Sequence, residues 1–281
     1  MTIRIITDTT ADITAEEAAE WNIDVLPMRI FFGQESYVDN VTMTKDQFYD
    51  RILQNDVPSA TSQPSTQEYA NAYKKMEAEG ASQIILIHMS KNFSHMYESA
   101  SQAIEMSGVK IPITIYDSNT ISSAMGIIVL AAAKMAKSGA SKEAIIARLD
   151  YIRDNTYAFI LFNDLKYFAQ SGRADKIKNF LGASATLNTK HIFCIKNGEF
   201  TPAFHVRSYA KGMKKLLDIV HEAPQIEDVA ISYTTNRQDA EFLSEILMES
   251  LPAGKVRVSQ ASAILGSHGG PDTLGIAYRV C

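Results

Sequence analysis

The amino-acid sequence predicts an α/β protein of two domains. The N-terminal domain is expected to hold a mostly parallel sheet covered by helices, and the C-terminal domain a mixed or antiparallel sheet with helices. Three observations predict this. The 281 residues are 46% hydrophobic, enough for two compact cores or one large one. Strand and helix patterns alternate through the first half, as in crossover connections between parallel strands. Beyond residue 155 the apolar segments shorten, so we expect domains over 1–155 and 156–281.

The N-terminal half opens with a β-branched run, IRIIT at 3–7, which predicts a strand. DTTAD follows it and offers capping side chains for a helix over TAEEAAEWN. The same periodicity, with Gly80 as a helix stop, predicts the remaining elements of this half. They are strands at 25–32, 83–89 and 112–117, and helices at 44–54, 66–80, 94–107, 122–137 and 141–155.

The C-terminal half has a different hydrophobic pattern. Short apolar segments at 156–162, 191–207 and 228–235 are interrupted by helical patterns. Within the second segment, Asn197-Gly198 lies between two apolar runs, and both residue types accept positive φ, so KNGEF predicts a β-hairpin. These features predict the mixed or antiparallel sheet.

Composition and charge exclude several classes of partner. The net charge is −5, and the Lys and Arg residues are scattered, so we expect no nucleic acid and at most transient membrane contact. The start lacks the apolar core of a signal peptide, and the apolar run at 126–133 is too short to span a bilayer. We therefore expect a cytoplasmic location.

Several common chemistries lack their residues in this sequence. GxxxxGK[ST], GxGxxG after a strand, HExxH and GxSxG are all absent, which argues against P-loop, dinucleotide, zincin and nucleophile-elbow sites. Cys194 and Cys281 are far apart, without CxxC spacing, so a disulfide scaffold or zinc site is not expected. No cofactor is expected.

Two clusters of hydroxyl side chains follow predicted strands. TSQPS at 61–65 places Thr61 and Ser62 close to Pro64. A solvent-exposed loop without a further role usually contains Lys, Glu or Gly instead. Ser94 follows the buried strand at 83–89. Each cluster can cap the next helix, or it can hold hydroxyls and amides against an anion.

Two further clusters lie in the C-terminal half. ILGSHGGPDTLG at 264–275 is the richest glycine stretch, and its glycines and proline predict a shaped loop that displays His268 rather than a helix. A lone histidine is also common as a satisfied structural residue. The segment at 171–173, Ser-Gly-Arg, fits either a helix end or an exposed basic contact.

Taken together and in order, six motifs resemble the DegV family over Ile3 to Val280. They are DTTADI, TSQPS, the serine-to-YESA segment at 94–100, the SGR segment, HVRSYAKGMKKL at 205–216 and GSHGGPDTLG at 266–275. The resemblance implies a bacterial fatty-acid-binding protein, similar to fatty acid kinase B subunits. Two α/β domains would enclose an acyl chain between them.

The resemblance also implies roles for individual residues. The carboxylate of a long-chain fatty acid would be held by Thr61, Ser62, Ser94 and His268. Arg173 and Arg207 would lie at the pocket mouth or on the surface that docks a partner. That partner would be an ATP-dependent kinase subunit resembling dihydroxyacetone kinase, to which this chain, itself not an enzyme, presents the carboxylate for acyl-phosphate formation.

Two departures from the family pattern bear on the site. Ser94-His95-Met96 stands where Ser-Gly-Thr is usual, so a bulky imidazole replaces a glycine. The last loop has Asp272 after Gly-Gly-Pro, and this carboxylate can either orient His268 or cap a turn.

Two other function classes fit the same residues. One is a hydrolase or acyltransferase that uses Ser94 or Ser62, His268 as base and Asp8 or Asp272 as orienting carboxylate. The other is a small-molecule or nucleotide-binding module unrelated to lipids. A co-purified fatty acid distinguishes the lipid hypothesis from both.

Overall fold

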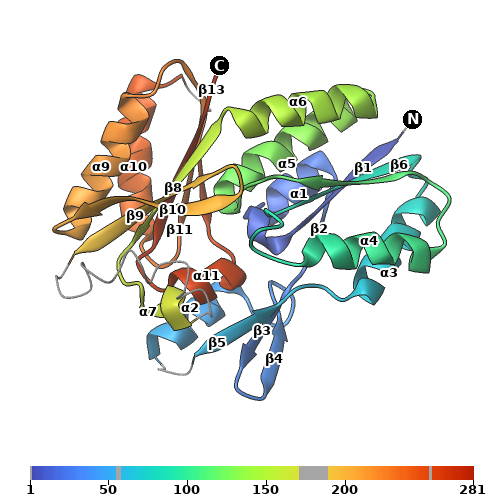
Figure 1. Cartoon of the computed structure of the whole chain (residues 1–281), viewed down its shortest axis with the longest axis horizontal. Coiled ribbons are helices and arrows are strands. Elements are labelled where there is room, and N and C mark those ends of the chain that lie inside the picture. The colour runs from blue at the N-terminus through green and yellow to red at the C-terminus, as the bar shows by residue number, and fades with distance from the viewer. Residues whose placement is uncertain (1, 55–57, 171–188, 253–254) are drawn as a thin grey trace.

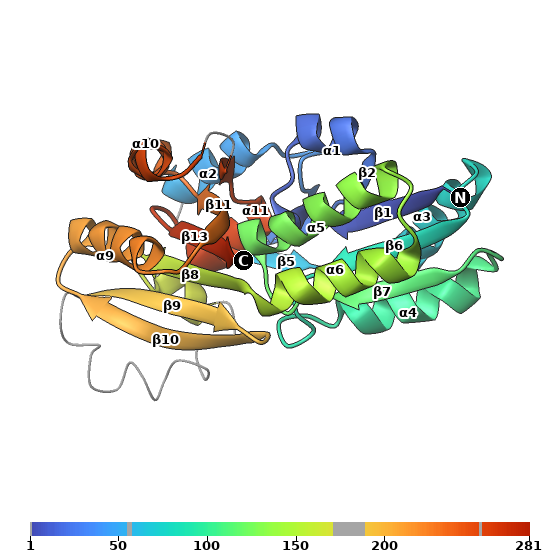
Figure 2. The same ribbon diagram turned by 90° about the horizontal axis from the view of Figure 1, so that it is seen from above.

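The computed structural model describes residues 2–54, 58–170, 189–252 and 255–281, which form three sheets (Figure 1). The first is fully parallel, with strand order β2-β1-β6-β7. Its strands are β1 (Ile3–Asp8), β2 (Ile23–Leu26), β6 (Gln83–His88) and β7 (Ile113–Asp117). Helices α1 (Ala15–Trp21), α5 (Ser122–Lys137) and α6 (Lys142–Asp154) cover one face, and α3 (Thr66–Ala78) and α4 (Met96–Ser107) the other (Figures 1 and 2).

The second sheet is mixed, with order β10-β9-β8-β13-β11-β12. Only β11 and β12 pair in parallel. Its strands are β8 (Thr156–Phe162), β9 (Lys190–Lys196), β10 (Glu199–Val206), β11 (Ile226–Tyr233), β12 (Val256–Gln260) and β13 (Leu274–Val280), covered on one side by α9 (Tyr209–His221) and α10 (Arg237–Ser250) (Figure 1). The predicted fold class is confirmed.

The third sheet is small and antiparallel, and the sequence did not predict it. It contains β3 (Arg29–Phe32), β4 (Glu35–Val38) and β5 (Ser59–Ser62), in the order β4-β3-β5, with α2 (Lys45–Gln54) nearby. The prediction of one strand at 25–32 is wrong. Pro27 has no N–H to give to a sheet, and the chain leaves the parallel sheet there and enters the small one.

Three short elements complete the fold. They are the 3₁₀ turn η1 (Thr9–Ala11), α7 (Lys166–Phe168) and α11 (Ala263–Gly269). Among the described helices, none combines the length and apolar character needed to cross a membrane.

Helix α5 joins the two large sheets. It contacts β1 of the parallel sheet and β8, β11 and β13 of the mixed sheet. One cluster of buried side chains continues from the parallel strands through this helix to Ala230 and Ala277. A helix covered on several sides has to be apolar on several sides, which explains its long apolar run.

The predicted hairpin is confirmed as β9–β10, and its tip contacts the parallel sheet's loops. Asn197 and Gly198 have φ of 53° and 75°, as this turn requires. The Gly198 amide donates to the carbonyl of Asn119 at 2.9 Å. Its carbonyl accepts from Ser90 Oγ at 3.2 Å and from Asn92 Nδ2 at 3.1 Å. The hairpin is therefore a second link between the sheets, besides α5.

Replacing Gly198 by alanine is expected to lower the free energy of unfolding by about 2–4 kcal/mol, measured by urea denaturation. A left-handed backbone costs an L-residue about 1–2 kcal/mol, and close contacts add to this. The new Cβ would lie 2.6 Å from Ser90 Oγ. Gly33 is the matched control, because it has φ of +60° but no atom within 4 Å of an added Cβ. Equal losses for the two variants would contradict the contribution of the tip contact.

Candidate functional site

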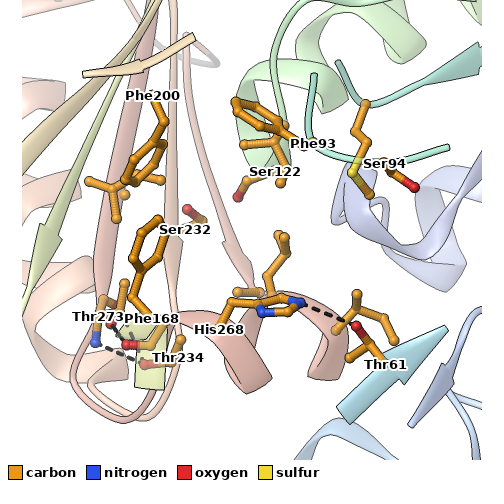
Figure 3. Close-up of a pocket in the computed structure, with 18 of the residues that line it drawn as sticks. Thr61, Phe93, Ser94, Ser122, Phe168, Phe200, Ser232, Thr234, His268 and Thr273 are labelled. Atoms are coloured by element: carbon orange, nitrogen blue, oxygen red, sulfur yellow. Dashed lines mark hydrogen bonds between the residues drawn. The ribbon is translucent and has the colours of Figure 1, made fainter. Parts of the chain in front are cut away.

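A cavity of about 400 Å³ lies where the three sheets and α11 meet (Figure 3). This volume is within the range of about 300–1,000 Å³ that is usual for small-molecule sites. Most of its wall is apolar, from Met28, Met89, Phe93, Ile121, Ile160, Phe162, Phe168, Phe200, Ile264 and Leu265. Such a cavity suits a largely apolar ligand.

The cavity has a polar corner formed by residues far apart in the sequence. Thr61, Ser62, Ser94 and His268 all line it. Thr61 Oγ1 and His268 Nε2 are hydrogen-bonded at 3.2 Å, and which of them donates depends on the imidazole tautomer (Figure 3). The structure thus places all four residues that the resemblance assigned to a carboxylate in the wall of one cavity, with Thr61 and His268 in contact and Ser94 apart from this pair (Figure 3).

The hydroxyls of residues 59–66 divide between two structural tasks. Thr61 and Ser62 belong to β5, where they pair with Ile30 and Arg29 of β3, so the expectation of a loop is wrong at these two positions. Ser65 accepts from the Glu68 amide and forms a capping box for α3. Capping therefore uses Ser65, whereas Thr61 and Ser62 reach the cavity.

Gln63 is a site residue that the sequence analysis missed. Its Oε1 accepts from Ser94 Oγ at 3.1 Å, and its Nε2 donates to Ser99 Oγ at 2.6 Å. It thereby fixes Ser94 relative to β5. Nothing in the sequence distinguishes it from other loop glutamines, because both partners lie more than thirty residues away.

His268 lies in helix α11, so the prediction of a displayed loop is wrong. Ser262 caps the helix by accepting from the Leu265 amide, a signal that the glycine-rich pattern obscured. Two hydrogen bonds to residues outside the helix hold its start in place. Asp12 accepts from the Ser262 amide at 2.7 Å, and the Tyr49 hydroxyl donates to the Ala261 carbonyl at 2.9 Å. These contacts fix the start of α11 and with it the position of the His268 imidazole.

Asp39 is fully buried near the start of α11, and this burial raises its pKa to about 6. Thr9, Lys45 and the Ala263 amide lower the pKa, but by less than burial raises it. The folded state thus holds the proton more tightly than the unfolded state, whose carboxyl titrates near its ordinary value of 3.8. Stability from this group is complete below pH 4 and is lost as the pH rises toward 6.

Asp39→Asn is therefore expected to become more stable relative to the parent protein as the pH rises. The difference in unfolding free energy should grow by about 2 kcal/mol between pH 4 and pH 7 and then level off. Urea denaturation at several pH values measures it. A difference that is constant over this range would contradict the raised pKa.

Aromatic rings form one wall of the cavity. Phe168 and Phe200 stack with centroids 5.1 Å apart, and Phe93 meets Phe200 edge-on at 6.4 Å. The sequence analysis did not assign them to the site. Their positions in α7, β10 and the loop after β6 give no common sequence pattern.

The two departures from the family pattern have simple structural consequences. His95 has φ of −88°, which any residue adopts, and its side chain is 92% exposed, so the backbone there does not need glycine. Met96 is buried against the core. Asp272 accepts from Thr235 Oγ1 at 2.8 Å and from Asn163 Nδ2 at 3.3 Å, so its carboxylate binds these two side chains rather than orienting His268.

The two predicted arginines, Arg173 and Arg207, are not among the residues of the polar corner described above. Arg207 is exposed between β10 and α9, whereas Arg173 lies outside the described residues. In residues 2–54, 58–170, 189–252 and 255–281, no group of three or more His, Cys, Asp or Glu side chains is placed to hold a metal ion.

The hydrolase alternative needs its serine, histidine and aspartate in one chain of hydrogen bonds. Ser94 instead donates to Gln63, and Asp8 is bonded to His88 Nδ1 at 2.8 Å and to Thr10. Asp272 is held by Thr235 and Asn163. The candidate groups thus have other partners.

Known proteins resemble this chain over its whole length. The family model described as DegV matches residues 2–280. A DegV domain-containing protein of Listeria monocytogenes is 32% identical over 280 residues, 98% of each chain. DegV of Bacillus subtilis, described as a fatty acid binding protein, is 26% identical with a TM-score of 0.89, and both chains are fully covered. A DegV family protein from Thermus thermophilus, at 24% identity and full coverage of both chains, shares the fold with a TM-score of 0.89. The chain belongs to the DegV family.

Proposed function

We propose that this protein binds a long-chain fatty acid in the cavity and does not turn it over by itself. The observation that carries the proposal is one hydroxyl–imidazole corner, Thr61 with His268, in an otherwise mostly apolar cavity. Ser62 would complete the carboxylate site together with Ser94, whose hydroxyl would turn from Gln63 Oε1 to the ligand. The description of the Bacillus subtilis relative as a fatty acid binding protein supports the proposed ligand class, as does that of a stearic acid-binding protein from Eubacterium ventriosum with the same fold.

The energetics make the head group decisive. Burying ~14 methylenes at roughly 0.8 kcal/mol each contributes about 11 kcal/mol, whereas association costs about 4–15 kcal/mol. A buried carboxylate also loses its hydration unless charge-assisted hydrogen bonds replace it. The polar corner therefore determines whether binding is useful.

The proposal includes a division of the chain at Asn155, with domains 1–155 and 156–281 and the ligand between them. The first would supply Thr61, Ser62 and Ser94, and the second His268. The strands of the mixed sheet all come from residues 156–280, which supports this division.

Mass spectrometry of the purified protein under denaturing conditions tests the proposed function. A co-purified C14 to C18 fatty acid is expected, and after its removal, added palmitate, myristate or oleate should raise the melting temperature. An acyl group attached to serine would instead favour the hydrolase or acyltransferase alternative. Unchanged melting with all three acids would contradict the proposal.

We further propose that the bound carboxylate is presented to an ATP-dependent kinase subunit resembling dihydroxyacetone kinase, which forms the acyl phosphate. The chain lacks a nucleotide motif of its own. Arg207 is exposed, and with Arg173 it would offer positive charge to an acidic partner surface on a protein of net charge −5.

Charge reversal tests this docking surface. Arg173→Glu combined with Arg207→Glu is expected to reduce acyl-phosphate formation with the cognate kinase subunit about tenfold or more, while fatty-acid binding stays intact. Lys142→Glu, at the start of α6 beside the parallel sheet, is the control. Unchanged phosphorylation in the double variant would contradict the docking role.

A further inference from the structure

A second set of hydroxyls lies in the cavity, outside the carboxylate site. Ser122, at the start of α5, and Ser232, Thr234 and Thr273, from the mixed-sheet side, also line it (Figure 3). Ser232 lies near the end of β11, and Thr234 directly follows that strand. These groups interrupt an otherwise apolar wall.

The hydrogen bonds of this set leave one hydroxyl unused. Thr273 Oγ1 donates to the Gly269 carbonyl at 2.7 Å, and Thr234 Oγ1 accepts from the Thr273 amide at 2.9 Å. Ser122 Oγ donates to Asp12 at 2.6 Å. Ser232 Oγ has no hydrogen-bond partner within the described parts of the chain, although the residue is only 6% exposed.

The sheet makes room for this unused hydroxyl. Ser232 pairs with Gly275, which in turn pairs with Ile160, so the three form one row across the cavity-facing side. A Cβ on Gly275 would lie 2.4 Å from Ser232 Oγ. The missing side chain lets the hydroxyl lie over the glycine and stay open to the cavity.

An apolar acyl chain that covers Ser232 would bury a hydroxyl without a partner, which is costly. An oxygen on the ligand removes that cost by accepting a hydrogen bond from Ser232 Oγ. Ser122 Oγ donates its hydrogen bond to Asp12, but its lone pairs can still accept a hydrogen bond from a ligand hydroxyl. A hydroxyl group on the chain suits both serines, because it donates and accepts.

We infer that Ser232, with Ser122, forms a polar subsite for a hydroxyl group on the acyl chain, and that hydroxylated long-chain fatty acids are a preferred ligand class of this protein. The inference rests on the proposed function, since it concerns the same cavity. It makes Ser232 a specificity-determining residue, separate from the groups proposed to hold the carboxylate.

The test compares stearate with its 3-, 10- and 12-hydroxy derivatives on delipidated protein, by titration calorimetry, for the parent protein and for Ser232→Ala. In the parent protein, at least one isomer should bind more tightly than stearate. In Ser232→Ala that isomer should lose about 5- to 100-fold in affinity, whereas stearate should bind equally well or better. Ser244→Ala, which removes an equally buried serine outside the cavity, should change neither.

The outcomes separate this inference from the proposed function. If stearate binds but no hydroxylated isomer binds more tightly in the parent protein, or if Ser232→Ala does not weaken the preferred isomer more than stearate, the polar subsite is wrong and fatty-acid binding stands. If neither stearate nor any isomer binds, both proposals are wrong.

Discussion

Replacing Thr61 by valine and His268 by alanine in one protein is expected to weaken binding of laurate by about 100-fold or more. Hydrogen bonds to a charged group contribute about 1.5–3 kcal/mol each, and the double variant removes two of them. Valine keeps the shape of threonine, so the change is mainly chemical at that position. Titration of delipidated protein with the acid measures the effect.

The alkane of the same length distinguishes head-group loss from packing loss. Dodecane lacks a carboxylate, so its affinity should change little in the double variant. Ser59→Ala, which removes another hydroxyl of β5 that does not line the cavity, should leave both affinities unchanged. Equal losses of laurate and dodecane binding would show that the two residues act through packing, contrary to the proposed head-group site.

Replacing Leu265 by tryptophan is expected to weaken stearate binding by about 30-fold. Leu265 lines the cavity from α11, three residues before His268 and therefore on the same helix face. The larger ring would displace two or three methylenes, and each costs roughly 0.8 kcal/mol when it is left exposed. Fluorescence displacement on the folded variant measures the loss.

Leu53 provides the matched control. It is on α2 and 60% exposed, so Leu53→Trp should leave stearate binding unchanged. Unchanged binding in Leu265→Trp would mean that the acyl chain does not occupy this part of the cavity.

The sequence predicts those parts of the fold that depend on local signals. The hairpin at Asn197-Gly198 and the long helix 122–137 have strong signals within a few residues, and both are present. The segment 25–32 shows the limit. Its composition suits a strand throughout, yet β2 pairs with β1, whereas β3 pairs with β4, the next strand along the chain, and with the more distant β5. Pro27 marks the break between the halves, but their composition does not show which strands each half pairs with.

The site shows the same limit. Thr61 and His268 are 207 residues apart, and only the ordered motifs suggested that they act together. The glycines around His268 predicted a loop, whereas Ser262 in fact caps a short helix there. Gln63 and the Phe168–Phe200 stack are defined by contacts between residues about thirty positions apart, so no spacing rule identifies them.

A crystal structure of the stearate complex tests the central claim most directly. We expect a carboxylate oxygen within hydrogen-bond distance of both Thr61 Oγ1 and His268 Nε2, with the acyl chain running toward the rings of Phe168 and Phe200 (Figure 3). A carboxylate placed elsewhere in the cavity, or stearate bound outside it, would contradict the account.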